Sequence, residues 1–87
     1  MYRILNTEDL HLVQMQQKDW FVTVGTIRKY RERGAWYFHA VVNFVGSHHS
    51  SKENSFFQAV TYILWRNGMS VYDAEQIAPD IISNSEI

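Results

Sequence analysis

The chain has no cysteine, one proline and four glycines among its 87 residues. The lack of cysteine excludes disulfides, thiolate catalysis and cysteine-ligated zinc, and it gives no redox reason to place the protein outside the cell. No apolar run approaches the roughly 20 residues that span a membrane, and no basic start followed by an apolar stretch indicates a secretion signal. We therefore expect a cytoplasmic protein with no membrane among its partners.

The chain also lacks a strong net charge, since its formal charge is −1 at pH 7. Bulk charge thus gives no argument for binding nucleic acid or an anionic membrane. Apolar residues make up 46% and aromatic residues 15% of the chain, which predicts a packed globule rather than a disordered chain. At this length we expect a single domain over 1–87, in which 80–87 forms a frayed tail.

The clearest local pattern predicts a β-hairpin. Segments 20–30 and 35–45 are rich in aromatic and β-branched residues, which favour strands. Gly34 suits the left-handed position of a three-residue loop with a bulge, formed by Glu32, Arg33 and Gly34. This loop predicts a register in which Arg31 faces Ala35.

The predicted register separates the hairpin into two faces, because successive side chains of a strand point to opposite sides. The predicted core face carries Trp20, Val22, Val24, Trp36, Phe38, Ala40, Val42 and Phe44. The predicted wet face carries Thr23, Lys29, Arg31, Tyr37, His39 and Asn43, with Phe21, Ile27, Val41 and Val45 among them.

Two helices are predicted after the hairpin. The first covers about 53–67, because Ser50 and Glu53 have the spacing of a capping box and Gly68 suits a helix end. Its core stripe consists of Phe56, Phe57, Val60, Ile63 and Leu64. The second helix covers about 71–78, with Ser70 as its cap and Pro79 as its end.

The N-terminal segment is ambiguous. Tyr2 to Leu5 can form a further short strand, whereas 10–17 alternates like a strand but contains Gln and Met, which favour a helix. We expect a helix over 10–17. The fold class is then α+β, a small antiparallel sheet covered on one face by the helix at 53–67. A two-stranded sheet is marginal, so a third strand or a dimer is expected.

Chemistry-bearing residues gather in the segment 46–51, which is expected to be a loop. His48 and His49 lie beside several serines there, but structural zinc needs about four ligands and the other histidines lack standard spacing. There is no Gly-x-Ser-x-Gly turn, no acid to orient a histidine and no phosphate-binding loop. We expect no metal site, no cofactor and no enzymatic activity.

The side of the first helix opposite its core stripe is unusually poor in charge. Tyrosine and tryptophan often anchor protein interfaces. We expect either the 70–82 segment or a partner to cover Trp65, and favour the segment. The predicted partner-binding residues are Gln58, Tyr62, Trp65 and Tyr37.

The outer end of the hairpin, 28–37, mixes cations with aromatic rings, as nucleic-acid-binding surfaces do. Lysine and arginine also protect hairpin ends from aggregation. The predicted nucleic-acid contacts are Arg28, Lys29, Arg31 and Arg33. The leading hypothesis is a small non-enzymatic inhibitor or adaptor that contacts another protein, of the kind found in phages and mobile elements. A nucleic-acid-binding module is the alternative.

Overall fold

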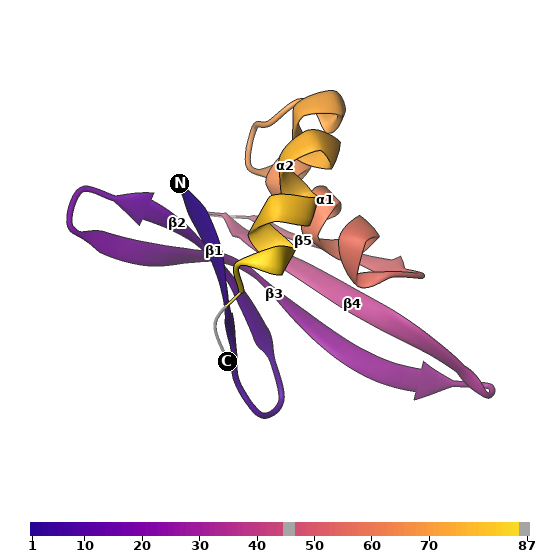
Figure 1. The fold of residues 1–87 in the computed structure, drawn as a ribbon. Helices are drawn as coiled ribbons and strands as arrows, with labels where there is room; N and C mark the ends of the chain where they lie inside the picture. Colours follow the sequence, from indigo (N-terminus) through magenta and orange to yellow (C-terminus); the bar gives the residue numbers. More distant parts are fainter. Residues whose placement is uncertain (45–46, 86–87) are drawn as a thin grey trace.

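The structure is a computed structural model that describes residues 1–44 and 47–85. Within these residues the strands are β1 (Tyr2–Asn6), β2 (His11–Gln17), β3 (Trp20–Glu32), β4 (Ala35–Phe44) and β5 (Ser47–Glu53), followed by the helices α1 (Phe56–Arg66) and α2 (Val71–Ser83). The strands form one antiparallel sheet in the order of the sequence, and both helices lie on one face of it (Figure 1). The α+β class and the helix-covered sheet are confirmed.

The core lies between the sheet and the helices. Its fully buried side chains come from every layer: Ile4, Val13, Ile27, Ala40 and Val42 from the sheet, Ala59, Val60, Ile63 and Leu64 from α1, and Ala74 and Ala78 from α2. Phe56 and Phe57, predicted for the same stripe of α1, pack against this core while partly exposed. No helix in the described ranges is long and apolar enough to cross a membrane.

The β3–β4 hairpin turns over two residues instead of the predicted three. Arg33 and Gly34 have φ angles of 50° and 82°, so the positive φ predicted for Gly34 is confirmed. Two consecutive left-handed residues match the twist of the flanking strands. Glu32 therefore pairs with Ala35, and Ile27 pairs with Ala40. The predicted register was wrong by one residue, so Ile27, predicted for the wet face, is fully buried.

A β-bulge in β3 returns the residues that precede it to the face of the sheet that was predicted for them. Val13 pairs with Gly25 whereas Gln14 pairs with Thr23, so Val24 is an extra residue in β3. Val24 is buried beside the predicted core residues Ala40 and Val42. Because of the bulge, apolar residues of β3 both before and after Val24 lie on the same face of the sheet.

Three residues predicted for the core are exposed instead. Trp20 is 61% and Trp36 50% exposed, and Val22 is exposed as well. They lie toward the outer ends of the β2–β3 and β3–β4 hairpins, which extend beyond the helices (Figure 1). The strands are longer than the helical layer that covers them. A side chain at the end of a hairpin therefore stays exposed even when it points to the helix side of the sheet. The predicted places of Phe44 and Val45 lie outside the described side chains.

Two segments form strands that the sequence analysis did not predict. The helix predicted over 10–17 was wrong, because this segment forms β2 between β1 and β3. Ile4 pairs with Val13 in this arrangement, and both side chains are fully buried. Hydrogen bonding to a strand on each side outweighs a weak helix preference. The loop expected at 46–51 is instead largely β5, a polar edge strand paired with β4.

Both helices have boundaries that differ from the prediction. The predicted capping box at Ser50 was wrong, because Ser50 lies in β5. Ser55 caps α1 instead, where its hydroxyl oxygen accepts a hydrogen bond from the Gln58 backbone N–H at 3.1 Å. Gly68 ends α1 with a φ of 104°, and Ser70 caps α2, as predicted.

The helix α2 continues through Pro79, its predicted end, as far as Ser83. The last turns are held because Ile81 is buried and Ile82 packs against the core. The helix α2 thus includes residues 80–83 of the segment that was expected to be a frayed tail.

Candidate binding surfaces

An open groove of about 490 Å³ runs along the side of α1 that faces away from the sheet. It brings together three of the four residues predicted for partner binding, because positions three and four apart lie on one side of a helix. The groove is lined by Phe57, Gln58, Thr61, Tyr62 and Trp65 of α1, by Val71 and Glu75 of α2, and by Glu53 and Ser55 before α1.

Trp65 is held in place while much of its ring remains accessible. The Tyr62 ring contacts it edge-on at a centroid distance of 5.9 Å, and the Arg66 guanidinium lies 5.1 Å from its centroid. Arg66 is itself held by the His49 ring at 3.0 Å. With these neighbours in place, Trp65 is still 43% exposed. The ring is thus oriented before any partner binds.

The helix α2 forms one wall of the groove but does not cover Trp65. Its small residues Ala74 and Ala78 pack fully buried in the core. Val71 lines the groove, whereas Tyr72 is 70% exposed and lies outside it. The favoured expectation that the 70–82 segment covers Trp65 was therefore wrong.

The groove lining is aromatic and acidic. Glu53 and Glu75 both line it, and the Glu53 carboxylate accepts a hydrogen bond from the Ser51 hydroxyl. No lysine, arginine or histidine is among the described residues that line it. The sequence analysis assigned Phe57 to the core stripe and missed its place in the groove, although Phe57, Thr61 and Trp65 follow one another at intervals of four residues. It could not show that α2 would add Glu75.

Tyr37, the fourth predicted partner-binding residue, lies on the opposite face of the sheet. The neighbouring Phe38 points toward the helices, where its ring contacts Phe56 at 5.8 Å. Since side chains alternate along a strand, Tyr37 points away from them. There it pairs with Tyr30, and the Lys52 ammonium lies 4.2 Å from its ring centroid. Tyr37 cannot share a ligand contact with Trp65.

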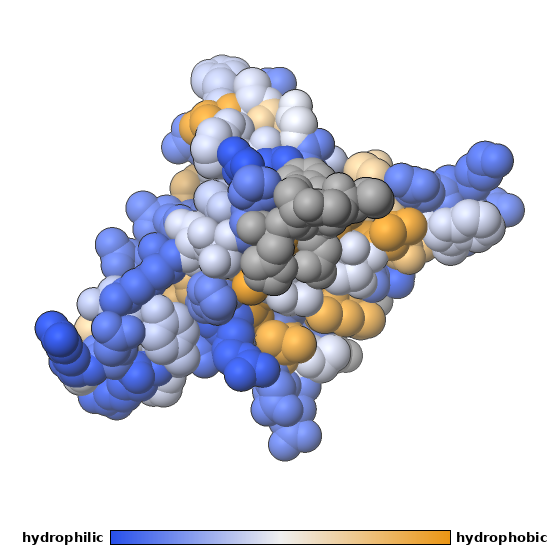
Figure 2. All heavy atoms as spheres, turned by 180° about the vertical axis from the view of Figure 1, so that it is seen from behind, coloured by the Kyte–Doolittle hydropathy of each residue, from blue (hydrophilic) through white to orange (hydrophobic). Residues whose placement is uncertain are grey.

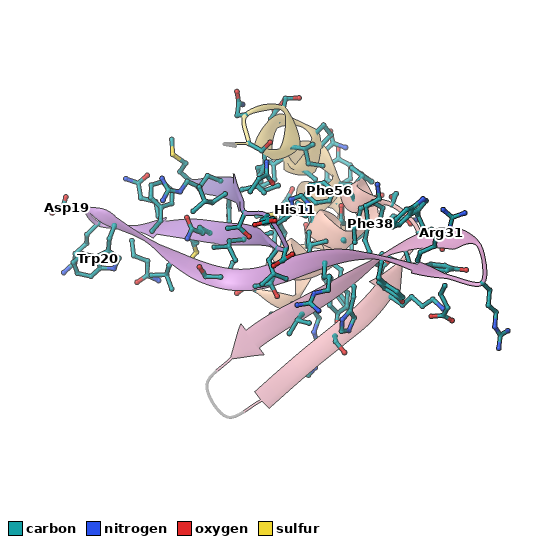
Figure 3. All side chains as sticks on the ribbon, turned by 90° about the horizontal axis from the view of Figure 1, so that it is seen from below. His11, Asp19, Trp20, Arg31, Phe38 and Phe56 are labelled. Carbon is teal, nitrogen blue, oxygen red and sulfur yellow. The ribbon has the colours of Figure 1, made fainter. Side chains whose placement is uncertain are left out.

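The four cations predicted for nucleic acid do not form one patch. Lys29 and Arg31 lie on the helix side of the hairpin against the Trp36 ring, at 4.6 Å and 5.4 Å from its centroid. Arg28 lies on the other face and Arg33 in the turn. Hydrophilic residues gather at this end of the hairpin (Figure 2), and Arg31 and Trp20 mark opposite ends of the sheet (Figure 3).

His11 lies in the middle of the sheet beside Phe56, whose ring it contacts edge-on at 4.8 Å (Figure 3). Burial, and to a lesser extent the charge of Lys29, lower the pKa of His11. His11 therefore favours the neutral form. It lines a polar hollow with Thr7, Glu8, Asp9, Arg28 and Lys29.

The histidines and acids form no metal-binding group in the described part of the chain. No three His, Asp or Glu residues lie together there in a way that could hold a metal ion. His49 faces Arg66 instead, and the side chain of His48 lies outside the described residues.

No known protein family, curated protein or solved structure matches the chain.

Proposed function

We propose that the protein is a non-enzymatic protein-binding module of the cytoplasm, an adaptor or inhibitor that holds a segment of another protein in the groove of α1 and α2. One observation carries this proposal: Trp65 is 43% exposed, yet two neighbouring side chains hold its ring in place. Tryptophan and tyrosine dominate the binding energy of protein interfaces when a partner removes them from water. A ring held in advance also loses little conformational freedom on binding.

The groove favours a partner segment with an apolar side chain next to lysine or arginine. Phe57, Tyr62 and Trp65 offer aromatic surface to the apolar side chain. Glu53 and Glu75 offer negative charge to the flanking cations, and no cation in the described lining opposes them. Charge complementarity of this kind selects the partner and speeds its approach more than it adds affinity.

Selection of peptides from a random library displayed on phage tests this proposal. We expect the selected peptides to share an apolar or aromatic residue flanked by Lys or Arg. In calorimetric titrations, Trp65→Ala should weaken their binding at least tenfold, which is about 1.4 kcal/mol. Glu75→Lys should also weaken it by opposing the peptide's charge. Tyr72→Ala is the matched control, because this tyrosine lies on α2 outside the groove.

The Trp65→Ala variant should remain folded, because its ring is partly exposed and the loss of stability should stay below the ~3–5 kcal/mol of a core ring. Binding should depend on salt less steeply than phosphate contacts do, because only two carboxylates line the groove. The proposal fails if no peptide is enriched, or if the selected peptides bind Trp65→Ala as tightly as the wild type.

A further inference from the structure

The sheet face opposite the helices carries no covering element among residues 1–44 and 47–85 (Figure 1). On β3, β4 and β5 this face presents two rows of side chains that run across the strands. One row consists of Arg28, His39 and Lys52, which pair in that order. The next row consists of Tyr30 and Tyr37, which face each other across β3 and β4. We name these five residues the sheet platform.

The rings of the sheet platform contact one another. The Tyr30 and Tyr37 ring centroids lie 5.9 Å apart with an interplanar angle of 33°, and the Tyr30 and His39 rings meet edge-on at 6.4 Å. His39 is exposed, and both tyrosines are half-buried. Contact between the rings limits their motion, so a ligand would find an ordered aromatic surface here rather than isolated side chains.

The platform is bordered by positive charge. The Lys52 ammonium forms an ion pair with Glu32 at 3.1 Å, and this contact raises the pKa of Lys52. Glu8 and Asp9 line a hollow with Arg28, but neither forms an ion pair with it in the described structure. Arg28 is exposed. Arg28 thus borders the rings, whereas the Lys52 ammonium lies over the Tyr37 ring at 4.2 Å from its centroid and is offset by a single carboxylate, Glu32.

The net charge of −1 conceals a separation of charge between the two layers. Residues 1–53, a range that contains all five strands, include seven Lys/Arg and five Asp/Glu. Residues 54–85, which contain both helices, have one Lys/Arg and three Asp/Glu. A polyanion is therefore attracted to the sheet rather than to the helical layer.

We propose that the sheet platform binds single-stranded RNA. Unpaired bases stack on aromatic side chains, and arginine and lysine contact the phosphates between them. A duplex keeps its base faces stacked and cannot use the rings in this way. The hydroxyl groups of Tyr30 and Tyr37 offer hydrogen-bond partners to the ribose 2′-hydroxyl, which DNA lacks.

This inference goes beyond the proposed function, because it uses a different face of the molecule. The groove lies along α1 and α2, whereas the platform lies on the far side of the sheet. None of the described residues lines both surfaces. RNA and a peptide can therefore be bound at the same time, as an adaptor between them requires.

Fluorescence anisotropy with a labelled oligouridine of about 12 nucleotides, at low salt, tests the inference. We expect wild-type protein to bind it, and Tyr37→Leu to weaken binding about tenfold or more by removing one stacking surface. Trp36→Leu is the matched control. Trp36 precedes Tyr37 in β4, and its ring lies on the opposite face of the sheet. The affinity for the oligouridine should therefore change less than about twofold.

The cations are tested through the salt dependence. Log affinity should fall with log salt by about 0.7 for each phosphate contact of a single strand, so Arg28→Gln with Lys52→Gln should flatten the slope by about 1.4. The control pair is Lys29→Gln with Arg31→Gln, on the helix side. Circular dichroism should show that each variant is folded.

Several results would overturn the inference. They are absence of binding at low salt, equal losses for Trp36→Leu and Tyr37→Leu, and equally tight binding of duplex RNA or of an oligothymidine strand. Trp65→Ala, which tests the groove, should leave RNA binding unchanged. Failure of the platform therefore leaves the protein-binding proposal standing, and failure of the groove leaves the platform standing.

Discussion

At the scale of single residues, glycine determines how closely α1 approaches the sheet. Gly25 follows the bulge residue Val24 and lies directly beneath Ile63 of α1. A Cβ atom added to Gly25 would lie 2.7 Å from Ile63 Cγ2 and 3.0 Å from its Cδ1 atom. Both residues lie in the buried region, so the space between helix and sheet is already filled there.

Gly25→Ala should lower the free energy of unfolding by about 1–3 kcal/mol, because an overpacked core forces side chains and backbone to shift. Urea denaturation measures this change. The double variant Gly25→Ala with Ile63→Ala, which removes the contacting Cγ2 and Cδ1 atoms, should be more stable than the sum of both single changes predicts if the contact with Ile63 causes the loss. A double variant less stable than the sum of both single changes would contradict this explanation.

The turn of the β3–β4 hairpin offers a second test at this scale. Arg33 and Gly34 both have positive φ, and asparagine followed by glycine is the preferred pair for such a turn. Arg33→Asn should therefore stabilise the protein by a few tenths of a kcal/mol, and Gly34→Val should destabilise it by about 1 kcal/mol or more. Thermal unfolding compares the two. Equal stability of both variants would show that the turn does not require left-handed residues.

At the scale of the elements, α2 shows how core packing keeps a helix intact through a proline. Pro79 lacks the N–H group that would bond to the carbonyl of Glu75, and its ring crowds that carbonyl. The helix nevertheless continues to Ser83, and Ile81 is buried beyond the proline. Burial of the last turns thus offsets a local penalty that ends many helices.

Pro79→Ala should raise the free energy of unfolding by about 1–3 kcal/mol, because a backbone hydrogen bond is regained and only the proline's restriction of the unfolded chain is lost. Urea denaturation measures the gain. Gln76→Ala, an exposed site in the preceding turn, is the control and should change stability within about 0.5 kcal/mol. A destabilised Pro79→Ala variant would mean that the core depends on the proline's kink.

At the scale of the whole molecule, the described chain extends 42 × 29 × 25 Å, with the hairpin ends reaching beyond the helical layer (Figure 1). This shape leaves Trp20 and Trp36 exposed at opposite ends of the sheet, and Trp65 exposed on the helices. The two proposed binding surfaces lie on opposite faces for the same reason, since the helices cover a single face. His11 lies in the middle, where its burial links pH to folding.

Global stability should fall as the pH drops below about 6.5, because burial and Lys29 lower the pKa of His11 from its usual 6.5. Between the two pKa values the unfolded chain binds more protons than the folded one, so stability rises with pH in this window. Above about pH 6.5 His11 is neutral in both the folded and the unfolded chain, so it no longer lowers the stability. Urea unfolding at pH values of about 7.5 and 5.5 measures it.

His11→Asn should reduce the difference in stability between the two pH values, even though the variant also loses its ring contact with Phe56. The comparison is between slopes, so a lower overall stability does not obscure the result. An unchanged slope in His11→Asn would show that the pH dependence arises elsewhere.

Features that depend on nearby residues were predictable from the sequence alone. The positive φ of Gly34, the end of α1 at Gly68 and the cap of α2 at Ser70 each follow from the steric freedom or hydrogen bonding of one residue. The buried stripe of α1 follows from its spacing, and so does the grouping of Gln58, Tyr62 and Trp65. These features require no knowledge of distant strands.

Features that depend on pairing between distant segments were decided only in the tertiary structure. The identity of β2 and β5 as strands, the one-residue shift of β3 against β4 and the bulge at Val24 all require a partner strand in place. The same holds for the sheet platform, because Lys52 reaches Tyr37 only when β5 pairs with β4. Local preferences differ by less free energy than the burial and hydrogen bonding that a correct pairing provides, and that pairing is absent from any short stretch of sequence.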